Sequence, residues 1–233
     1  MTQSAPAETA AVFIEPVIGE GGYIVPPKSF MKGLRELTKK HGMLLVADEV
    51  QSGFGRTGKW FGIQHFDVEP DIMTIAKGLA SGMPISGVIS RLDLMSKWIP
   101  GSHGGTYGGN AVAAAAGVAT IKAIREEKIL DNVNARGSQL KAGLAHLQEK
   151  YPQIAEVRGL GLMIGTEFRD AHGKPDKTFT KAVQHGCIDR NMLILTAGPW
   201  DNTIRWIPPL IVTEEQINDG LNIFESALAE AVK

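Results

Sequence analysis

The chain has 233 residues, of which 43% are hydrophobic and 21% charged, as is usual for a soluble globular protein with one or two domains. Its 24 basic and 25 acidic side chains nearly balance, so no net field would recruit nucleic acid or an anionic membrane. Cys187 is the only cysteine, which excludes an internal disulfide. The start of the chain does not look like a secretory signal, and no apolar run reaches membrane-spanning length. We therefore expect a cytoplasmic protein that acts on small molecules.

In the first half of the chain, short apolar runs alternate with helix-like segments, which predicts an α/β fold with a mostly parallel sheet. Between the first two runs, Pro27 opens a predicted helix and Gly42 ends it. Asn110 is expected to cap a second helix, whose small residues permit close packing. The runs expected to form strands are 11–17, 43–47, 71–76 and 85–90. The buried face of the first helix is predicted to carry Phe30, Leu34 and Leu37.

From about residue 126 the pattern changes to a charged amphipathic helix at 131–150 and a long C-terminal helix. Thr213 and Gln216 form a predicted capping box at the start of the C-terminal helix. Its buried stripe is expected to hold Ile217, Leu221, Phe224 and Leu228. The short strands expected here are 161–168, 192–196 and 202–207. We therefore predict a large domain over residues 1–125, with 1–9 disordered, and a smaller α+β domain over residues 126–233.

The segment MLLVADEVQSGFGRTG, residues 43–58, places Asp48 and Glu49 where an apolar strand ends. Ligands of open α/β sheets collect at the carboxyl ends of the strands, and the three glycines that follow allow a close backbone approach. The alternative is that Asp48 caps a turn and Glu49 faces water.

Lys77 directly follows the predicted strand 71–76 and precedes Gly78. Most lysines lie on solvated surfaces, but a lysine held in dry surroundings is a nucleophile for Schiff-base chemistry. Pyridoxal phosphate requires a lysine for its aldehyde and a carboxylate for its pyridine nitrogen. Lys77 and Asp48 are predicted to supply this pair at one edge of the sheet.

The stretch GGTYGGNA leads into the helix that Asn110 caps. Backbone N–H groups of such a turn and the Thr106 hydroxyl can cradle a phosphate, although a plain connecting loop has the same composition. No metal site is expected, because the six histidines show no ligand spacing with one another or with Cys187.

Five motifs, in this order, resemble the second half of the class III, fold-type I pyridoxal-phosphate aminotransferases, which include 4-aminobutyrate, ornithine and acetylornithine aminotransferases. The resemblance covers nearly everything after residue 10 and implies part of the large cofactor-binding domain followed by the small C-terminal domain. The motifs are FIEPVIGEGGYIVPP, LLVADEVQSGFGRTG, IAKGLASGMPI, HGGTYGGN and VRGLGLMIGTE.

The resemblance implies that Lys77 is the Schiff-base lysine and that Asp48 partners the pyridine nitrogen. It further implies that Val50 packs on the ring and that Gln51 bonds near the ring hydroxyl. Thr106 is implied to reach the phosphate held by a neighbouring subunit, which makes a homodimer part of the mechanism.

Glu20 and Arg205 match a pair that acts as a gate in the 4-aminobutyrate-type members. The resemblance implies that Arg205 binds the α-carboxylate of glutamate or 2-oxoglutarate. Glu20 is implied to neutralise Arg205 when an ω-amine occupies the site. Without the resemblance, a surface ion pair is the simpler interpretation.

Members of that family extend further at the N-terminus, so the resemblance implies a chain without the N-terminal half. We expect a partner chain, or a second copy, to supply missing parts of the site. The predicted function is transfer of an amino group from an ω-amino acid to a 2-oxo acid. Two alternatives remain: another reaction of the family, such as decarboxylation or racemisation, and a non-catalytic fragment that dimerises or binds another chain.

Overall fold

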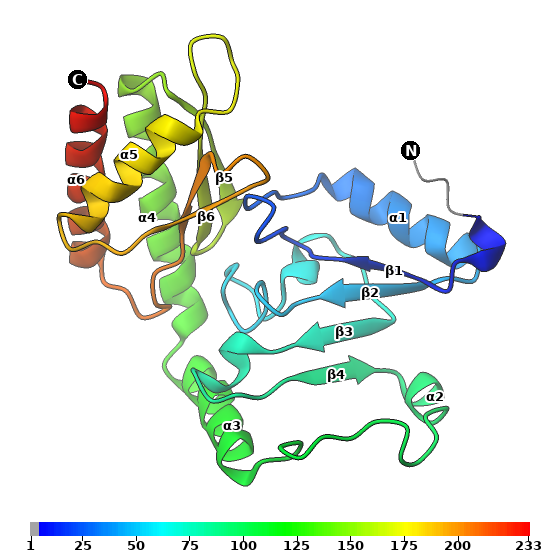
Figure 1. The fold of residues 1–233 in the computed structure, drawn as a ribbon. Coiled ribbons are helices and arrows are strands. Elements are labelled where there is room, and N and C mark those ends of the chain that lie inside the picture. The colour runs from blue at the N-terminus through cyan, green and yellow to red at the C-terminus, as the bar shows by residue number, and fades with distance from the viewer. Residues whose placement is uncertain (1–4) are drawn as a thin grey trace. The chain divides into compact units, whose positions relative to one another are not determined.

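The structure is a computed structural model that describes residues 5–233. These residues fold into two compact units (Figure 1). The first unit comprises the residues up to 16, 26–54 and 59–128, and the second comprises 17–25, 55–58 and 129–233. The predicted domains, divided once between residues 125 and 126, contain no such interleaved segments. No helix within residues 5–233 is long and apolar enough to cross a membrane.

The first unit contains a four-stranded mixed sheet in the order β1-β2-β3-β4. The pairs β1–β2 and β2–β3 are parallel, whereas β4 runs antiparallel to β3. The strands are β1 (Ala11–Ile14), β2 (Leu44–Asp48), β3 (Ile72–Ile75) and β4 (Gly87–Ser90). All four lie within the predicted apolar runs or one residue beyond them, and the α/β character of this half is confirmed.

Helices and short 3-10 helices connect these strands (Figure 1). They are η1 (Pro6–Glu8), α1 (Lys28–Lys40), η2 (Gly62–His65), η3 (Lys77–Ala80), α2 (Leu92–Met95) and α3 (Ala111–Glu126). Asn110 caps α3 as predicted, because its Oδ1 accepts a hydrogen bond of 3.0 Å from the Ala113 N–H. Positions 1–4 of the expected disordered stretch 1–9 lie outside the described residues. Within the rest of that stretch, Pro6–Glu8 form η1, so the expectation is wrong there.

The face that α1 buries differs from the prediction. Phe30 and Leu37 are 51% and 48% exposed, whereas Met31 and Thr38 are buried. The reason is Arg35, which shares the face of Met31 and Thr38 and binds the buried Asp71 beside the sheet. A buried carboxylate needs its charged partner, so this ion pair and Met31 determine which side of the helix faces inward.

Asp71 connects the starts of β2 and β3. Its carboxylate accepts hydrogen bonds from Arg35 Nη1 and Nη2 at 2.5 and 3.0 Å, from Arg91 Nη1 at 2.8 Å and from the Leu45 N–H at 2.8 Å. The Asp71 N–H in turn donates to the Leu45 carbonyl at 2.8 Å. Burial alone would raise the pKa of Asp71, but the hydrogen bonds from Arg35, Leu45 and Arg91 together lower it to about 2.

The second unit is built on an antiparallel sheet in the order β5-β6-β8-β7. Its strands are β5 (Ile154–Leu160), β6 (Met163–Phe168), β7 (Leu195–Ala197) and β8 (Thr203–Trp206). Its helices are α4 (Ile129–Lys150), α5 (Lys177–Ile188) and α6 (Glu214–Ala231). The sequence analysis missed β5 and α5, whereas the capping box of Thr213 and Gln216 on α6 is present as predicted.

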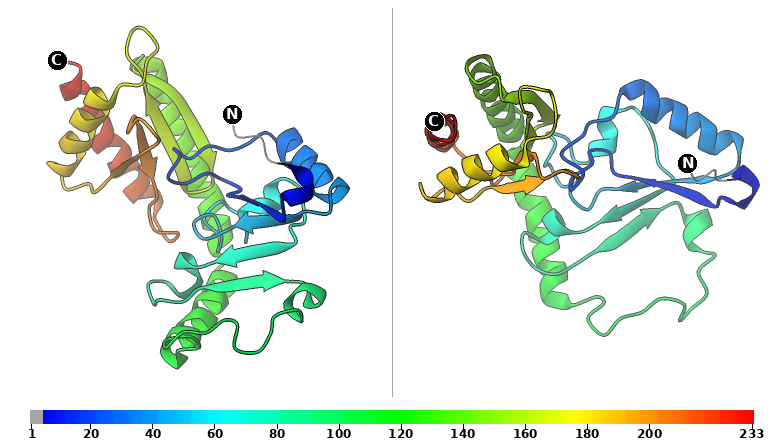
Figure 2. Two further views of the ribbon diagram at one scale, coloured as in Figure 1. Left: turned by 45° about the vertical axis from the view of Figure 1, so that its right-hand side comes forward. Right: turned by 45° about the horizontal axis from the view of Figure 1, so that its top comes forward.

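The two faces of the second sheet carry different side chains. Ile164, Phe168, Ile204 and Trp206 are buried on the face that packs against the helices, where Trp206 and Phe168 contact Phe224 of α6. On the opposite face, Met163 packs in a buried cluster with residues from the segment 17–25. Figure 2 shows α4, α5 and α6 together on one side of this sheet. The second sheet therefore has an apolar core on one face and holds an added loop on the other.

The pH dependence of stability should reveal the role of Asp71. Because its pKa is about 2 in the folded protein and 3.8 ordinarily, the ionised group stabilises the fold above about pH 4, and this contribution is lost as the pH falls through about 2. We expect Asp71→Asn to lower the free energy of unfolding at neutral pH and to remove this part of the acid sensitivity. Urea unfolding followed by circular dichroism across that pH range measures both effects.

Asp67→Asn is the matched control, because the Asp67 side chain is 65% exposed and its ion pair with Lys28 is 3.8 Å long. Its unfolding curves should follow those of the parent chain at every pH. Equal acid sensitivity in the parent chain and in Asp71→Asn would contradict the assignment.

Candidate functional site

Asp48 is the last residue of β2, and its register partner on β3 is Thr74. Asp48 Oδ1 accepts hydrogen bonds from the Thr74 hydroxyl at 3.1 Å and from the Val50 N–H at 3.0 Å. Among residues 5–233, no donor hydrogen-bonds to Oδ2. The Val50 contact is the turn cap that the simpler interpretation predicted, but the strand-to-strand contact with Thr74 also fixes the direction of the carboxylate. One carboxylate oxygen is thus held while the other remains available.

Glu49 does not face water, which corrects that part of the simpler interpretation. Its side chain is completely buried and accepts hydrogen bonds from the Ser52 hydroxyl at 2.6 Å and from the N–H groups of Gly62 and Ile63 at 2.8 and 2.7 Å. Burial raises the pKa of Glu49, although these three donors oppose the shift. Glu49 therefore ties the residue after β2 to the start of η2 and holds the intervening loop.

Val50 and Gln51 lie at the start of that loop and are half-buried. Gln51 Oε1 is buried and has no hydrogen-bond partner among the described residues. A buried polar atom without a partner is uncommon and calls for a ligand or an ordered water. Gln51 lies three positions after Asp48, so its Oε1 is a second available acceptor in the segment that holds Asp48 Oδ2.

Lys77 begins η3, two residues after the end of β3. Its φ is +41°, a left-handed conformation that is costly for a residue with a side chain. Its side chain is exposed, so the dry surroundings expected from the sequence are absent from the described part of the chain. No ion pair or hydrogen bond engages its ammonium there.

Gly78 and α3 support the segment that carries Lys77. A Cβ at Gly78 would lie 3.3 Å from the Cβ of Phe54, which is tighter than most packed contacts. In α3, Gly117 is buried, and a Cβ there would lie 3.6 Å from the Leu79 carbonyl of η3. The Thr120 hydroxyl of α3 donates to the Ser81 hydroxyl at 3.1 Å. The close packing predicted for the small residues of α3 is therefore present, and η3 is its partner.

Thr106 lies in the loop before α3 and is exposed. Within residues 5–233 it makes no hydrogen bond, and no contact joins it to Asp48 or Lys77. The residues around it are also exposed, from 101 to 110. Its predicted role at the phosphate of a neighbouring subunit stays a prediction.

Glu20 and Arg205, which are 185 positions apart in the sequence, form an ion pair of 2.5 Å in the second unit. Arg205 lies on β8 with a side chain that is 14% exposed, whereas Glu20 is 73% exposed on the turn Gly19–Gly22. The turn is closed by two backbone hydrogen bonds between Ile18 and Ile24, of 2.9 and 3.2 Å. A mostly buried arginine thus faces a carboxylate that solvent can reach.

The sequence analysis missed two residues near this pair, the buried Tyr23 and the half-buried Arg56. Tyr23 is fully buried, and burial raises its pKa to about 12 against the opposing charges of Arg205 and Arg56. Arg56 donates to the carbonyls of Leu162 and Pro208 at 3.2 and 2.6 Å. Two sequence motifs could have identified these residues, because Tyr23 directly follows GEGG and Arg56 lies inside FGRTG.

Comparison with known proteins gives a consistent family. A family model described as "Aminotransferase class-III" matches residues 1–228. The 4-aminobutyrate aminotransferase GabT of Escherichia coli K12 is 43% identical over 98% of this chain and 54% of its own length. An alanine/serine racemase of Pyrococcus horikoshii is 40% identical over 97% of this chain and 48% of its own length. The chain spans about half the length of the curated relatives it matches.

Solved structures give the same result. The crystal structure of a transaminase from the marine bacterium Virgibacillus superposes with a TM-score of 0.91 and is 34% identical in sequence. The match covers 97% of this chain and 54% of the Virgibacillus chain. Both comparisons therefore concern nearly all of this chain and about half of each relative.

The buried Glu49 should control the loop that carries Val50 and Gln51. Glu49→Gln keeps the shape of the side chain but replaces one of the two accepting oxygens by an NH2 group, which cannot accept from the N–H of Gly62 or Ile63. We expect a loss of about 1–3 kcal/mol in the free energy of unfolding and faster hydrogen exchange at the Gly62 and Ile63 amides. Urea unfolding and amide exchange at neutral pH measure these effects.

Glu69→Gln is the control, because Glu69 is exposed in the same unit. It should change neither quantity. If the Gly62 and Ile63 amides exchange at the parent rate in Glu49→Gln, Glu49 does not hold the loop.

Proposed function

Because this chain belongs to the class III aminotransferase family, we propose that it is the second half of a pyridoxal-phosphate-dependent ω-aminotransferase. The proposed reaction moves an amino group from an ω-amino acid to a 2-oxo acid such as 2-oxoglutarate. The observation that supports it most is the arrangement of Asp48 and Lys77 at the carboxyl ends of the adjacent parallel strands β2 and β3. The Glu20–Arg205 ion pair supports the dicarboxylate as one of the two substrates.

The residues around Asp48 fit the proposed cofactor. Asp48 Oδ1 is held by Thr74 and Val50, which leaves Oδ2 to bond a protonated ring nitrogen. The unsatisfied Gln51 Oε1 can accept a hydrogen bond from the ring hydroxyl, and the half-buried Val50 can pack on the ring. When bound, pyridoxal phosphate supplies an aldehyde for a lysine amine and a pyridinium ring that accepts electrons from a substrate carbon.

Lys77 has two tasks in this proposal. Its Nζ would hold the cofactor through the aldehyde, and the same amine, when free, would take a proton from the substrate carbon. The Lys77 amine is exposed and has no ion-pair partner among residues 5–233, so it is available for the first task. The left-handed backbone at Lys77 and the packing of η3 on α3 restrict where Nζ can reach.

Glu20 and Arg205 select the substrate in each half-reaction. Arg205 binds the α-carboxylate of glutamate or 2-oxoglutarate when Glu20 moves away. When the ω-amine is bound, Glu20 returns and neutralises Arg205, because a paired arginine costs much less to desolvate than a lone one. The contrast in exposure, 14% for Arg205 and 73% for Glu20, suits a fixed arginine and a moving carboxylate.

The finer assignments follow from the family. We infer that the first unit is the second half of a fold-type I cofactor-binding domain and that the second unit is the small C-terminal α+β domain. A homodimer, or a partner chain that supplies the preceding half, completes the site, and Thr106 serves the phosphate of the neighbouring subunit. The proposed location is the cytoplasm, and no metal takes part.

A racemase reaction is the second candidate, because the Pyrococcus horikoshii alanine/serine racemase is 40% identical to this chain. A racemase interconverts the two enantiomers of one amino acid and has no need for a gate between two different substrates. The Glu20–Arg205 pair therefore favours the transaminase.

Covalent labelling tests the role of Lys77. Borohydride reduction of the chain with pyridoxal phosphate, followed by peptide mapping, should find a pyridoxyl group on Lys77 and none after Lys77→Ala. The physical reason is the strand-end position of Lys77 next to a glycine. The variants Lys59→Ala, Lys97→Ala and Lys122→Ala are the controls and should keep the label.

A label on another lysine would contradict the assignment of Lys77. The absence of any label, also after addition of a chain that supplies the preceding half, would instead favour a non-catalytic fragment.

Substrate selection tests Glu20 and Arg205 in a full-length enzyme that carries this half. Arg205→Ala should slow the half-reaction with glutamate or 2-oxoglutarate by roughly 2 to 4 kcal/mol, because a buried charge-assisted contact is lost. It should spare the half-reaction with the ω-amine. Glu20→Ala should do the reverse. Single-turnover kinetics of each half-reaction measure both effects, and equal slowing of both steps in both variants would leave the pair a structural one.

A further inference from the structure

One row of residues crosses three strands of the second sheet. Arg158 on β5 is the register partner of Gly165 on β6, and Gly165 is the register partner of Arg205 on β8. Residues directly opposite one another in antiparallel strands point to the same face. Two arginines therefore stand on one face of the sheet, with a position that has no side chain between them.

The turn that carries Glu20 occupies the place of that missing side chain. A Cβ at Gly165 would lie 3.2 Å from the Gly22 carbonyl oxygen and 3.2 Å from the Cβ of Tyr23. The cluster of Val17, Tyr23 and Met163 is buried beside it. The turn is thus seated between Arg158 and Arg205 and would be displaced by a larger residue at position 165.

Arg158 binds the backbone of this turn. Its Nε and Nη2 donate to the Gly22 carbonyl at 2.9 and 2.7 Å, and Nη2 also donates to the Thr203 hydroxyl at 3.3 Å. Gly22 is two positions from Glu20, and Thr203 is two positions from Arg205 on β8. One guanidinium group therefore contacts both elements that carry the gate.

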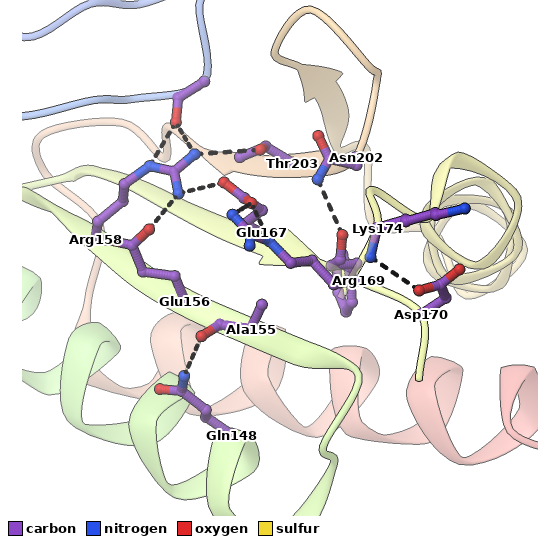
Figure 3. A network of polar contacts seen from close by, with 12 residues as sticks. Gln148, Ala155, Glu156, Arg158, Glu167, Arg169, Asp170, Lys174, Asn202 and Thr203 are labelled. Atoms are coloured by element: carbon purple, nitrogen blue, oxygen red, sulfur yellow. Dashed lines mark hydrogen bonds and ion pairs between the residues drawn. The ribbon is translucent and has the colours of Figure 1, made fainter. Parts of the chain in front are cut away.

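Two carboxylates hold Arg158 in this direction. Its Nη1 donates to Glu167 at 2.6 Å and to Glu156 at 2.8 Å, and its side chain is 12% exposed. Figure 3 shows the guanidinium between Glu156, Glu167 and Thr203. Hydrogen bonds from Arg158 and Arg169 lower the pKa of Glu167 despite its burial, so Glu167 stays ionised at neutral pH.

The turn has a further anchor beside the gate. The Gly198 N–H donates to the Glu20 carbonyl at 2.9 Å, which ties the backbone of Glu20 to the loop between β7 and β8. The Glu20 carboxylate pairs with Arg205. The backbone of the turn is thus fixed on both sides while the Glu20 side chain remains 73% exposed.

We propose that Arg158 is a positioning residue that seats the Gly19–Gly22 turn over Gly165 and thereby holds Glu20 within reach of Arg205. Its forked guanidinium is required, because its five hydrogen bonds leave from three nitrogens of one planar group, whereas an ammonium has three donors on a single nitrogen. The consequence for substrate choice rests on the proposed function of the Glu20–Arg205 gate. The seating of the turn itself does not depend on that proposed function.

Hydrogen exchange in the 233-residue chain tests the seating. In Arg158→Gln and in Arg158→Lys, the amides of Gly22, Tyr23 and Ile24 should exchange about tenfold faster or more, as expected when a charge-assisted hydrogen bond is lost. The pKa of Tyr23, about 12 in the parent chain, should fall toward 10.0 as its hydroxyl reaches water. Ultraviolet titration of the three tyrosines measures this second effect.

Arg169→Gln is the matched control, because Arg169 also pairs with Glu167, at 2.9 Å, and is 50% exposed. It should leave the turn amides and Tyr23 as they are in the parent chain. Parent-like exchange of the turn in Arg158→Gln, full rescue by Arg158→Lys, or equal acceleration throughout the second unit would each overturn the proposal.

A second experiment uses a full-length enzyme that contains this chain and measures the kinetics of each half-reaction. It distinguishes a role of Arg158 in positioning Glu20 from an effect on the stability of the fold. Arg158→Gln should resemble Glu20→Ala, with the ω-amine half-reaction slowed about tenfold and the dicarboxylate half-reaction spared. Adding Arg158→Gln to Glu20→Ala should have little further effect. Equal slowing of both half-reactions by Arg158→Gln, where Glu20→Ala alone separates them, would overturn the proposal. If Glu20→Ala itself separates nothing, the proposed gate fails, and the exchange experiment still decides the seating of the turn.

Discussion

The register between β2 and β3 is the constraint on which the candidate site depends. Asp71 pins it at the start of both strands, since its N–H and its carboxylate bond the carbonyl and the N–H of Leu45. Because side chains alternate along a strand, a slip of one residue would turn Asp48 to the other face and away from Thr74. A buried ion pair far from the site along the strands thus determines which groups meet at their carboxyl ends.

The second unit relies on the absence of side chains at a few positions. Gly165 leaves room for the turn before Tyr23, and Gly22, with a φ of +110°, could not take a Cβ without approaching Arg158 Nη2 to 3.1 Å. Hydrogen bonds then hold the turn in this position, because Arg158 donates to the Gly22 carbonyl and the Gly198 N–H donates to the Glu20 carbonyl. Close approach and hydrogen bonding are therefore both needed to bring Glu20 beside Arg205.

Local patterns in the sequence were sufficient for the strands of the first sheet, for the Asn110 cap and for the Thr213 capping box, because each depends on neighbouring residues. These patterns failed where a residue distant in the sequence determines which side chains are buried. Phe30 and Leu37 look like a buried face, yet Arg35 turns the helix toward Asp71. Glu49 looks like a surface residue, yet Gly62 and Ile63 supply its donors from beyond the loop. The Glu20–Arg205 pair, separated by 185 positions, was reached through the family motifs and not through spacing.

The interleaved segments described for the two units limit how this polypeptide can be divided. A single cut between α3 and α4 would release residues 129–233, but the stretches 17–25 and 55–58 of the second unit would stay covalently attached to the first. The separated piece would lack Glu20, Tyr23 and Arg56, and the buried cluster around Met163 would lose Val17. Proteolysis or gene splitting at that point therefore cannot yield two intact folding units, even though the boundary looks like an ordinary domain junction.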